Sequence, residues 1–124
     1  MKNLIVLVLW IMLLLGVLLA PIGAIDKWQF GGFRHWDKVG HMILFGITGF
    51  VCAYTASYFK TITSRTLFGL IFSVSLALLT EGLQHFVARD PDFCDFLADS
   101  SGLVLGLLAY VLLALRRESQ CPPD

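Results

Sequence analysis

Long apolar runs constrain the fold of this chain more than any other feature. Residues 4–25, 39–59, 67–87 and 95–115 are rich in Leu, Val, Ile and Phe, and short polar segments separate them. A helix rises about 1.5 Å per residue, so about 20 apolar residues cross a hydrocarbon core roughly 30 Å thick. The pattern predicts an all-α membrane protein, an antiparallel bundle of four transmembrane helices, with residues 1–124 as a single domain.

Composition favours the same class of protein. Hydrophobic residues make up 57% of the chain and charged residues 15%, whereas soluble domains carry about 25% charged residues. The formal net charge is zero, so the chain lacks the clustered excess of Lys and Arg that nucleic-acid binding requires. We therefore expect membrane lipids, and no nucleic acid, as partners. The sequence leaves an oligomer open.

The first apolar run has two interpretations. It could be a signal peptide, but it exceeds the usual apolar region of about 7–15 residues and lacks a clean small-x-small cleavage site, which favours an uncleaved helix. With that helix retained and the N-terminus inside, the inner face carries the excess of Lys and Arg once Lys38 and Arg89 are set aside as site candidates. The sequence predicts a multi-pass protein with both termini in the cytoplasm.

Polar and ionisable residues gather at the ends of these runs, where their cost marks them as functional candidates. In an antiparallel bundle, the start of the second run, the end of the third and the start of the fourth lie on one membrane face. The candidates for ligand binding or for a polar cluster on that face are Asp37, Lys38, His41, Glu81, Gln84, His85, Arg89, Asp95 and Asp99.

Helical spacing favours convergence of these side chains. Residues four apart share one helix face, and three pairs have this spacing: Asp37 and His41, Glu81 and His85, Asp95 and Asp99. Gly102 and Gly106 continue the last of these faces inward, which favours close helix packing there. A purely structural bundle would also show one polar face per helix, so that interpretation stays open.

The individual candidates also have structural interpretations. The histidines could be satisfied by a neighbouring carboxylate or by water, and one of the two aspartates that open the last run could cap its helix. Glu81 lies about 9 Å inside the end of its run. An isolated carboxylate at that depth would tend to take up a proton, so we expect Glu81 to pair with Arg89, Lys38 or His41.

The sequence does not predict a metal or a cofactor. No H-E-x-x-H or comparable spacing occurs among the polar candidates. The cysteines Cys52, Cys94 and Cys121 lie in separate segments without metal-ligand spacing, which is typical of space-filling or tail residues.

The order of the polar residues resembles the VanZ-like family of small bacterial membrane proteins. The matching residues, between about residues 36 and 107, are Asp37, Lys38, His41, Glu81, Gln84, Arg89, Asp95, Gly102 and Gly106. Where the family commonly has Asn, four residues after Asp95, this sequence has Asp99, which adds a carboxylate. The resemblance implies a protein of the bacterial cytoplasmic membrane and cell envelope, linked to resistance against teicoplanin-type glycopeptides.

Three functions follow from these residues, and the sequence does not decide whether the protein is an enzyme. The first is an outward-facing polar pocket that binds a lipid or a lipid-linked wall precursor, with Arg89 and Lys38 contacting its anionic groups. The alternative is a membrane-embedded hydrolase or transferase, in which the His, Glu and Asp side chains act as acid and base or hold a metal. The third is a buried polar network that fixes the order of the helices.

Overall fold

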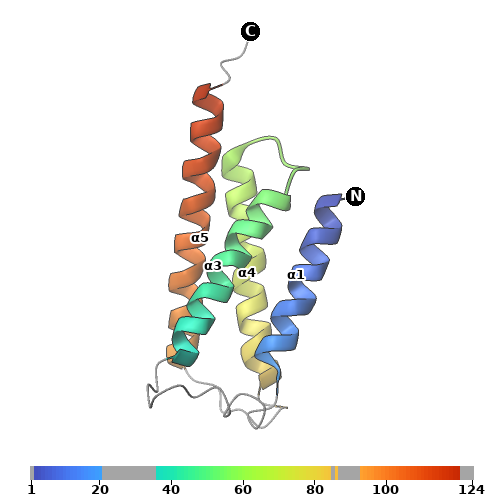
Figure 1. Ribbon diagram of the computed structural model, residues 1–124, viewed down its shortest axis with the longest axis vertical. Helices are drawn as coiled ribbons and strands as arrows, with labels where there is room; N and C mark the ends of the chain where they lie inside the picture. Colours follow the sequence, from blue (N-terminus) through green and yellow to red (C-terminus); the bar gives the residue numbers. More distant parts are fainter. Residues whose placement is uncertain (1, 21–35, 85, 87–92, 121–124) are drawn as a thin grey trace.

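The computed structural model describes residues 2–20, 36–84, 86 and 93–120. Within these ranges the chain forms four helices: α1 (Lys2–Leu18), α3 (Trp36–Thr55), α4 (Ile62–Gln84) and α5 (Phe93–Gln120). No β-strand occurs in the described ranges, which confirms the all-α prediction. Figure 1 shows the helices side by side and alternating in direction, with the start of α1 and the end of α5 at the same end of the bundle.

Three of the helices, α3, α4 and α5, are long and apolar enough to cross a membrane, while α1 is a shorter apolar helix of 17 residues. The observed bounds differ from the predicted runs. The first run, 4–25, continues beyond the end of α1 into residues outside the described ranges, and the last run, 95–115, is extended at both ends by α5. The two differ because a helix can continue into polar residues, whereas an apolar run marks only the residues suited to the hydrocarbon core of a membrane.

The turn between α3 and α4 ends in a side-chain cap. The hydroxyl oxygen of Thr61 accepts a hydrogen bond from the backbone N–H of Ser64 at 3.1 Å. Threonine at this position satisfies one of the N–H groups that the first turn of a helix leaves without an intrahelical partner. The cap explains why α4 begins at Ile62, five residues before the predicted apolar run.

Helix α3 and helix α4 each pack against the other three helices, and the most extensive pairing in the bundle is that of α3 with α5. Two glycines of α5 allow that pairing. A Cβ atom at Gly102 would clash with the carbonyl oxygen of Met42, and one at Gly106 would clash with the carbonyl oxygen of Gly46. The two backbones therefore approach more closely than any larger residue would permit.

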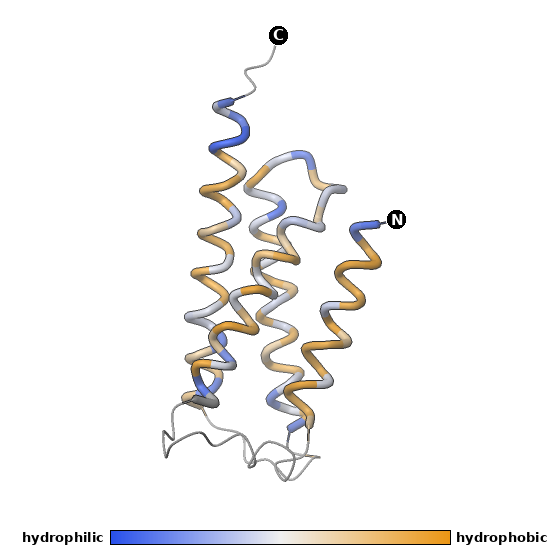
Figure 2. Tube along the Cα trace, viewed as in Figure 1, coloured by the Kyte–Doolittle hydropathy of each residue, from blue (hydrophilic) through white to orange (hydrophobic). Residues whose placement is uncertain are grey.

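Apolar side chains fill the interior and also cover the outside. One core cluster is built around Phe45 and Leu76, and a second around Leu103 and Leu107. Large apolar side chains on every helix remain exposed, among them Leu9, Ile43, Ile71 and Leu108. Hydrophilic positions gather at the two ends of the bundle (Figure 2). An apolar exterior of this extent marks an interaction surface, and a membrane suits its shape.

Candidate functional site

The polar candidates that the structure describes lie at one end of the bundle, where α3 begins, α4 ends and α5 begins (Figures 1 and 2). We call this the cluster end. Each helix contributes from its own terminal turns, because the alternating directions bring the start of α3, the end of α4 and the start of α5 together. Residues nearly 60 positions apart in the chain meet there.

The most deeply buried contact joins α3 to α5. The Nδ1 atom of His41 lies 2.9 Å from a carboxylate oxygen of Asp99, and the side chains are 4% and 1% exposed. When Asp99 is ionised, the contact requires Nδ1 to carry a proton and donate it. The carboxylate then fixes the orientation of the imidazole ring, as an orienting acid does beside a general base.

Glu81 joins this pair from α4. One ring nitrogen of His41, one carboxylate oxygen of Glu81 and one carboxylate oxygen of Asp99 all lie within 4.8 Å of one another. We call these residues the three-residue cluster. The expectation that Glu81 lies beside a basic partner fits this placement, with His41 as the neighbouring base. Imidazole and carboxylate groups are the donors that Zn²⁺ and similar divalent cations use in proteins.

A second ion pair lies nearer the surface. The Nζ atom of Lys38 donates to a carboxylate oxygen of Asp95 at 2.7 Å, and the side chains are 31% and 12% exposed. Asp95 lies in the first turn of α5, where the helix dipole also favours a negative charge. The pair links the first turns of α3 and α5 at the rim of the cluster end.

Gln84 is buried beside the same end but faces α1. Its side-chain amide donates to the backbone carbonyl of Leu18 at 3.4 Å, and only 3% of the residue is exposed. Gln84 thus links the end of α4 to the end of α1, whereas the three-residue cluster joins α3, α4 and α5.

Three of the candidates are not placed. His85 and Arg89 lie outside the described residues, and for Asp37 only the backbone position in α3 is described. The structure therefore does not test an anion contact by Arg89. The packing candidates Gly102 and Gly106 lie one and two turns beyond Asp99 in α5, where α5 contacts the backbone of α3.

Local sequence spacing does not reveal the shared donor set. The donors of the three-residue cluster come from three different helices, so no short motif contains them. Sequence reasoning also missed the hydrogen bond from the indole of Trp10 to the hydroxyl of Thr48, at 2.9 Å, which ties α1 to α3. A Trp and a Thr inside apolar runs were the only signal for that bond.

Comparisons with protein-family models, with curated proteins and with solved structures found no match to this chain. The likeness to the VanZ-like family therefore stays a hypothesis that rests on the motif residues alone. The fold and site define a class of protein, an all-α protein with membrane-length helices and a His–Glu–Asp cluster at one end, in which the His and the Asp are buried and the Glu is partly buried.

Proposed function

We propose that this chain is an integral membrane protein of the bacterial cell envelope, and that its cluster end binds the polar headgroup of a lipid or a lipid-linked wall precursor. The convergence of His41, Glu81 and Asp99 at one end of an otherwise apolar bundle carries the proposal. Buried ionisable groups are expensive in a membrane protein, and they mark the sites of ligands and proton transfer.

The membrane location is supported by the three helices of sufficient length and apolarity and by the apolar side chains exposed on every helix. We take α1 as a fourth span, with both termini in the cytoplasm and the cluster end facing outward. This orientation puts Lys2, Lys60, Arg65, Arg116 and Arg117 on the cytoplasmic side, in line with the excess of basic residues found on that side of membrane proteins.

The binding role is supported by how the charged groups are layered. Lys38 is partly exposed at the rim, where an ammonium group can exchange its contact with Asp95 for an anionic headgroup. The three-residue cluster lies behind this rim and offers an imidazole and carboxylates to hydroxyl or amino groups. Exposed side chains such as Ile43 and Leu97 line the outer surface nearby, where acyl chains would lie.

The resemblance to the VanZ-like family supports a role in the cell envelope and a link to glycopeptide resistance of the teicoplanin type. The matching residues Lys38, His41, Glu81 and Asp95 are those that meet at the cluster end. The additional carboxylate of Asp99 forms the contact with His41. An Asn at that position would keep a hydrogen bond but remove a charge, so Asp99 sets the charge of this particular site.

A second function is favoured by the contact between His41 and Asp99. An imidazole oriented by a carboxylate can accept a proton from water or an alcohol as its oxygen attacks a headgroup ester, and can return that proton to the leaving oxygen. Alternatively, the three-residue cluster can hold a divalent cation, which would activate the attacking water. Either arrangement would make the protein a membrane-embedded hydrolase or transferase.

Lipid mass spectrometry on protein purified in native membrane nanodiscs tests the binding function. Glu81→Gln removes the charge at the cluster while keeping the shape, and Arg116→Gln removes an exposed charge at the opposite end of the bundle. We expect wild type and Arg116→Gln to retain a headgroup-selective lipid that Glu81→Gln retains at a level several times lower. Equal retention by all three proteins would contradict the binding site.

Turnover separates the second function from the first. Purified protein is incubated with extracted envelope lipids, with and without a chelator, and new headgroup products are followed by mass spectrometry. If the cluster is catalytic, His41→Gln abolishes product formation while the retained lipid remains. If wild type forms no product under any of these conditions, only the binding function stands.

A further inference from the structure

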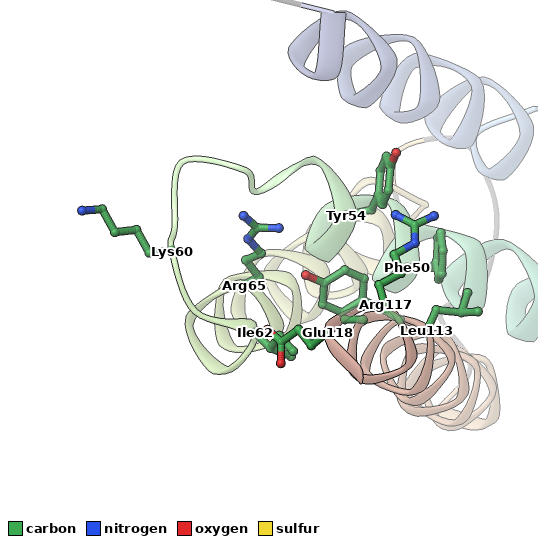
Figure 3. Close-up of a pocket in the computed structure, with 10 residues that line it drawn as sticks. Phe50, Tyr54, Lys60, Ile62, Arg65, Leu113, Arg117 and Glu118 are labelled. Atoms are coloured by element: carbon green, nitrogen blue, oxygen red, sulfur yellow. The ribbon is translucent and has the colours of Figure 1, made fainter. Parts of the chain in front are cut away.

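A cavity lies at the end of the bundle opposite the three-residue cluster, and we call this end the pocket end. The cavity has a volume of about 260 Å³ and opens between the last turns of α3, the start of α4 and the end of α5 (Figure 3). No candidate from the sequence analysis lines it. Its volume is below the roughly 300–1,000 Å³ of sites that enclose drug-sized ligands, so it suits a small group.

One wall of the cavity is aromatic. The rings of Phe50 and Tyr54 stack with centroids 6.1 Å apart, and the ring of Phe50 meets that of Tyr110 edge-on at 6.2 Å. Tyr110 is 5% exposed and Tyr54 is 48% exposed, so this wall runs from the interior of the bundle to its surface.

Three cationic side chains, Lys60, Arg65 and Arg117, line the same cavity, together with one acidic side chain, Glu118. Figure 3 shows Arg65 and Arg117 projecting from α4 and α5, while Lys60 extends outward from the connecting turn. The Nε–H of Arg65 donates to the backbone carbonyl of Phe59 at 2.7 Å. That bond orients the guanidinium group and leaves its other N–H groups for a ligand.

Within the described part of the chain, none of these three cations forms an ion pair with a carboxylate. The contrast with the cluster end is clear, since Lys38 there lies 2.7 Å from Asp95. The three cations outnumber the single carboxylate of Glu118 that lines the cavity, so the cavity attracts an anion. The guanidinium group is well suited to bind phosphate through two parallel hydrogen bonds.

We propose that the pocket end binds the phosphate of an anionic membrane lipid, with Arg65 and Arg117 as its principal contacts. This inference rests on the proposed membrane location but not on the function proposed for the cluster end. Basic pockets between membrane helices commonly hold anionic headgroups. Leu113 lines the cavity and is also 46% exposed, so the headgroup site continues onto an apolar helix surface where an acyl chain can lie.

Native mass spectrometry in detergent tests this site by titration with phosphatidylglycerol, with phosphatidylcholine and with inorganic phosphate. The variants are Arg65→Gln and Arg117→Gln. The matched control is Arg116→Gln, which removes the same charge from the neighbouring position of α5, a residue that does not line the cavity. Thermal unfolding of every variant in the same detergent verifies that each one is folded.

We expect phosphatidylglycerol to bind more tightly than phosphatidylcholine, and each of the two pocket variants to weaken that binding about tenfold, as the loss of a charge-assisted hydrogen bond predicts. Arg116→Gln should bind like wild type. Equal binding of the two lipids would overturn the proposal, as would equal losses in Arg116→Gln and Arg117→Gln. Binding of inorganic phosphate without any preference for the anionic lipid would also overturn it.

Discussion

The two ends of this bundle use charge in opposite ways. At the cluster end, His41 and Lys38 each lie within 3 Å of a carboxylate on α5, and the contacts are buried or partly buried. At the pocket end, Arg65 and Arg117 line a cavity, and the described residues include no carboxylate paired with them. Charges paired inside the protein connect its helices, whereas charges left beside a cavity are available to a ligand.

This difference matters energetically because a buried pair and a surface cation respond differently to substitution. Removal of one partner of a buried pair leaves the other charge desolvated and poorly compensated. Removal of a solvated cation leaves no buried charge without its partner. The comparison therefore predicts large losses of stability at the cluster end and small ones at the pocket end.

The largest loss is expected from Asp99→Ala. The substitution removes the carboxylate 2.9 Å from the buried ring of His41, and we expect the free energy of unfolding to fall by about 3 kcal/mol. Reversible unfolding in mixed micelles measures it. A loss below about 1 kcal/mol would show that the buried pair does not hold α3 to α5.

Gly102→Ala is expected to cost about 1–3 kcal/mol, because the added Cβ would meet the carbonyl oxygen of Met42 and force α3 and α5 apart. Gly82→Ala is the control, since a Cβ at Gly82 would point into open space beside α4. We expect the free energy of unfolding of Gly82→Ala to equal the wild-type value or to lie slightly above it. Similar free energies of unfolding for the two variants would show that this contact does not set the distance between α3 and α5.

Asp95→Asn tests the partly exposed pair at the rim of the cluster end. Lys38 is 31% exposed, so water can replace part of its contact with Asp95, and we expect a loss of about 1 kcal/mol. The measurement is the same unfolding experiment. A loss as large as that of Asp99→Ala would erase the distinction between the rim and the buried pair.

The smallest change is expected from Arg117→Gln, which removes a cation at the pocket end. The free energy of unfolding should stay within about 0.5 kcal/mol of the wild-type value. Lipid-free detergent is the appropriate medium, because a bound lipid would add its own stabilisation. A loss above about 1 kcal/mol would mean that Arg117 holds the bundle together as the buried pair does.

Much of the architecture could be predicted from the sequence, and for a physical reason. Apolar runs of membrane length leave the backbone few choices other than helices, and the polar turn before Ile62 makes α4 run back along α3. Alternating directions then place His41, Glu81 and Asp99 at one end. The predicted helix ends were less accurate, because the Thr61 cap and the continuation of α5 to Gln120 depend on hydrogen bonding rather than on hydropathy.

The partners within the site could not be predicted in the same way. From the sequence, Lys38 could pair with Glu81 or with Asp95. The partner depends on the axial and rotational position of α5 relative to α3. The contact of Gly102 with the backbone of Met42 fixes that relation. The pocket end could not be predicted either. Lys60, Arg65 and Arg117 lie far apart in the sequence or in different elements, and an aromatic wall built from α3 and α5 has no local pattern.

The most direct test of separate roles for the two ends is lipid mass spectrometry on four proteins purified in native nanodiscs: wild type, Glu81→Gln, the double variant Arg65→Gln/Arg117→Gln, and the combination of all three substitutions. We predict that wild type retains two kinds of lipid, that each single-end variant loses a different one, and that the combination loses both. Loss of the same lipid from both single-end variants, or no loss from Glu81→Gln, would contradict the account.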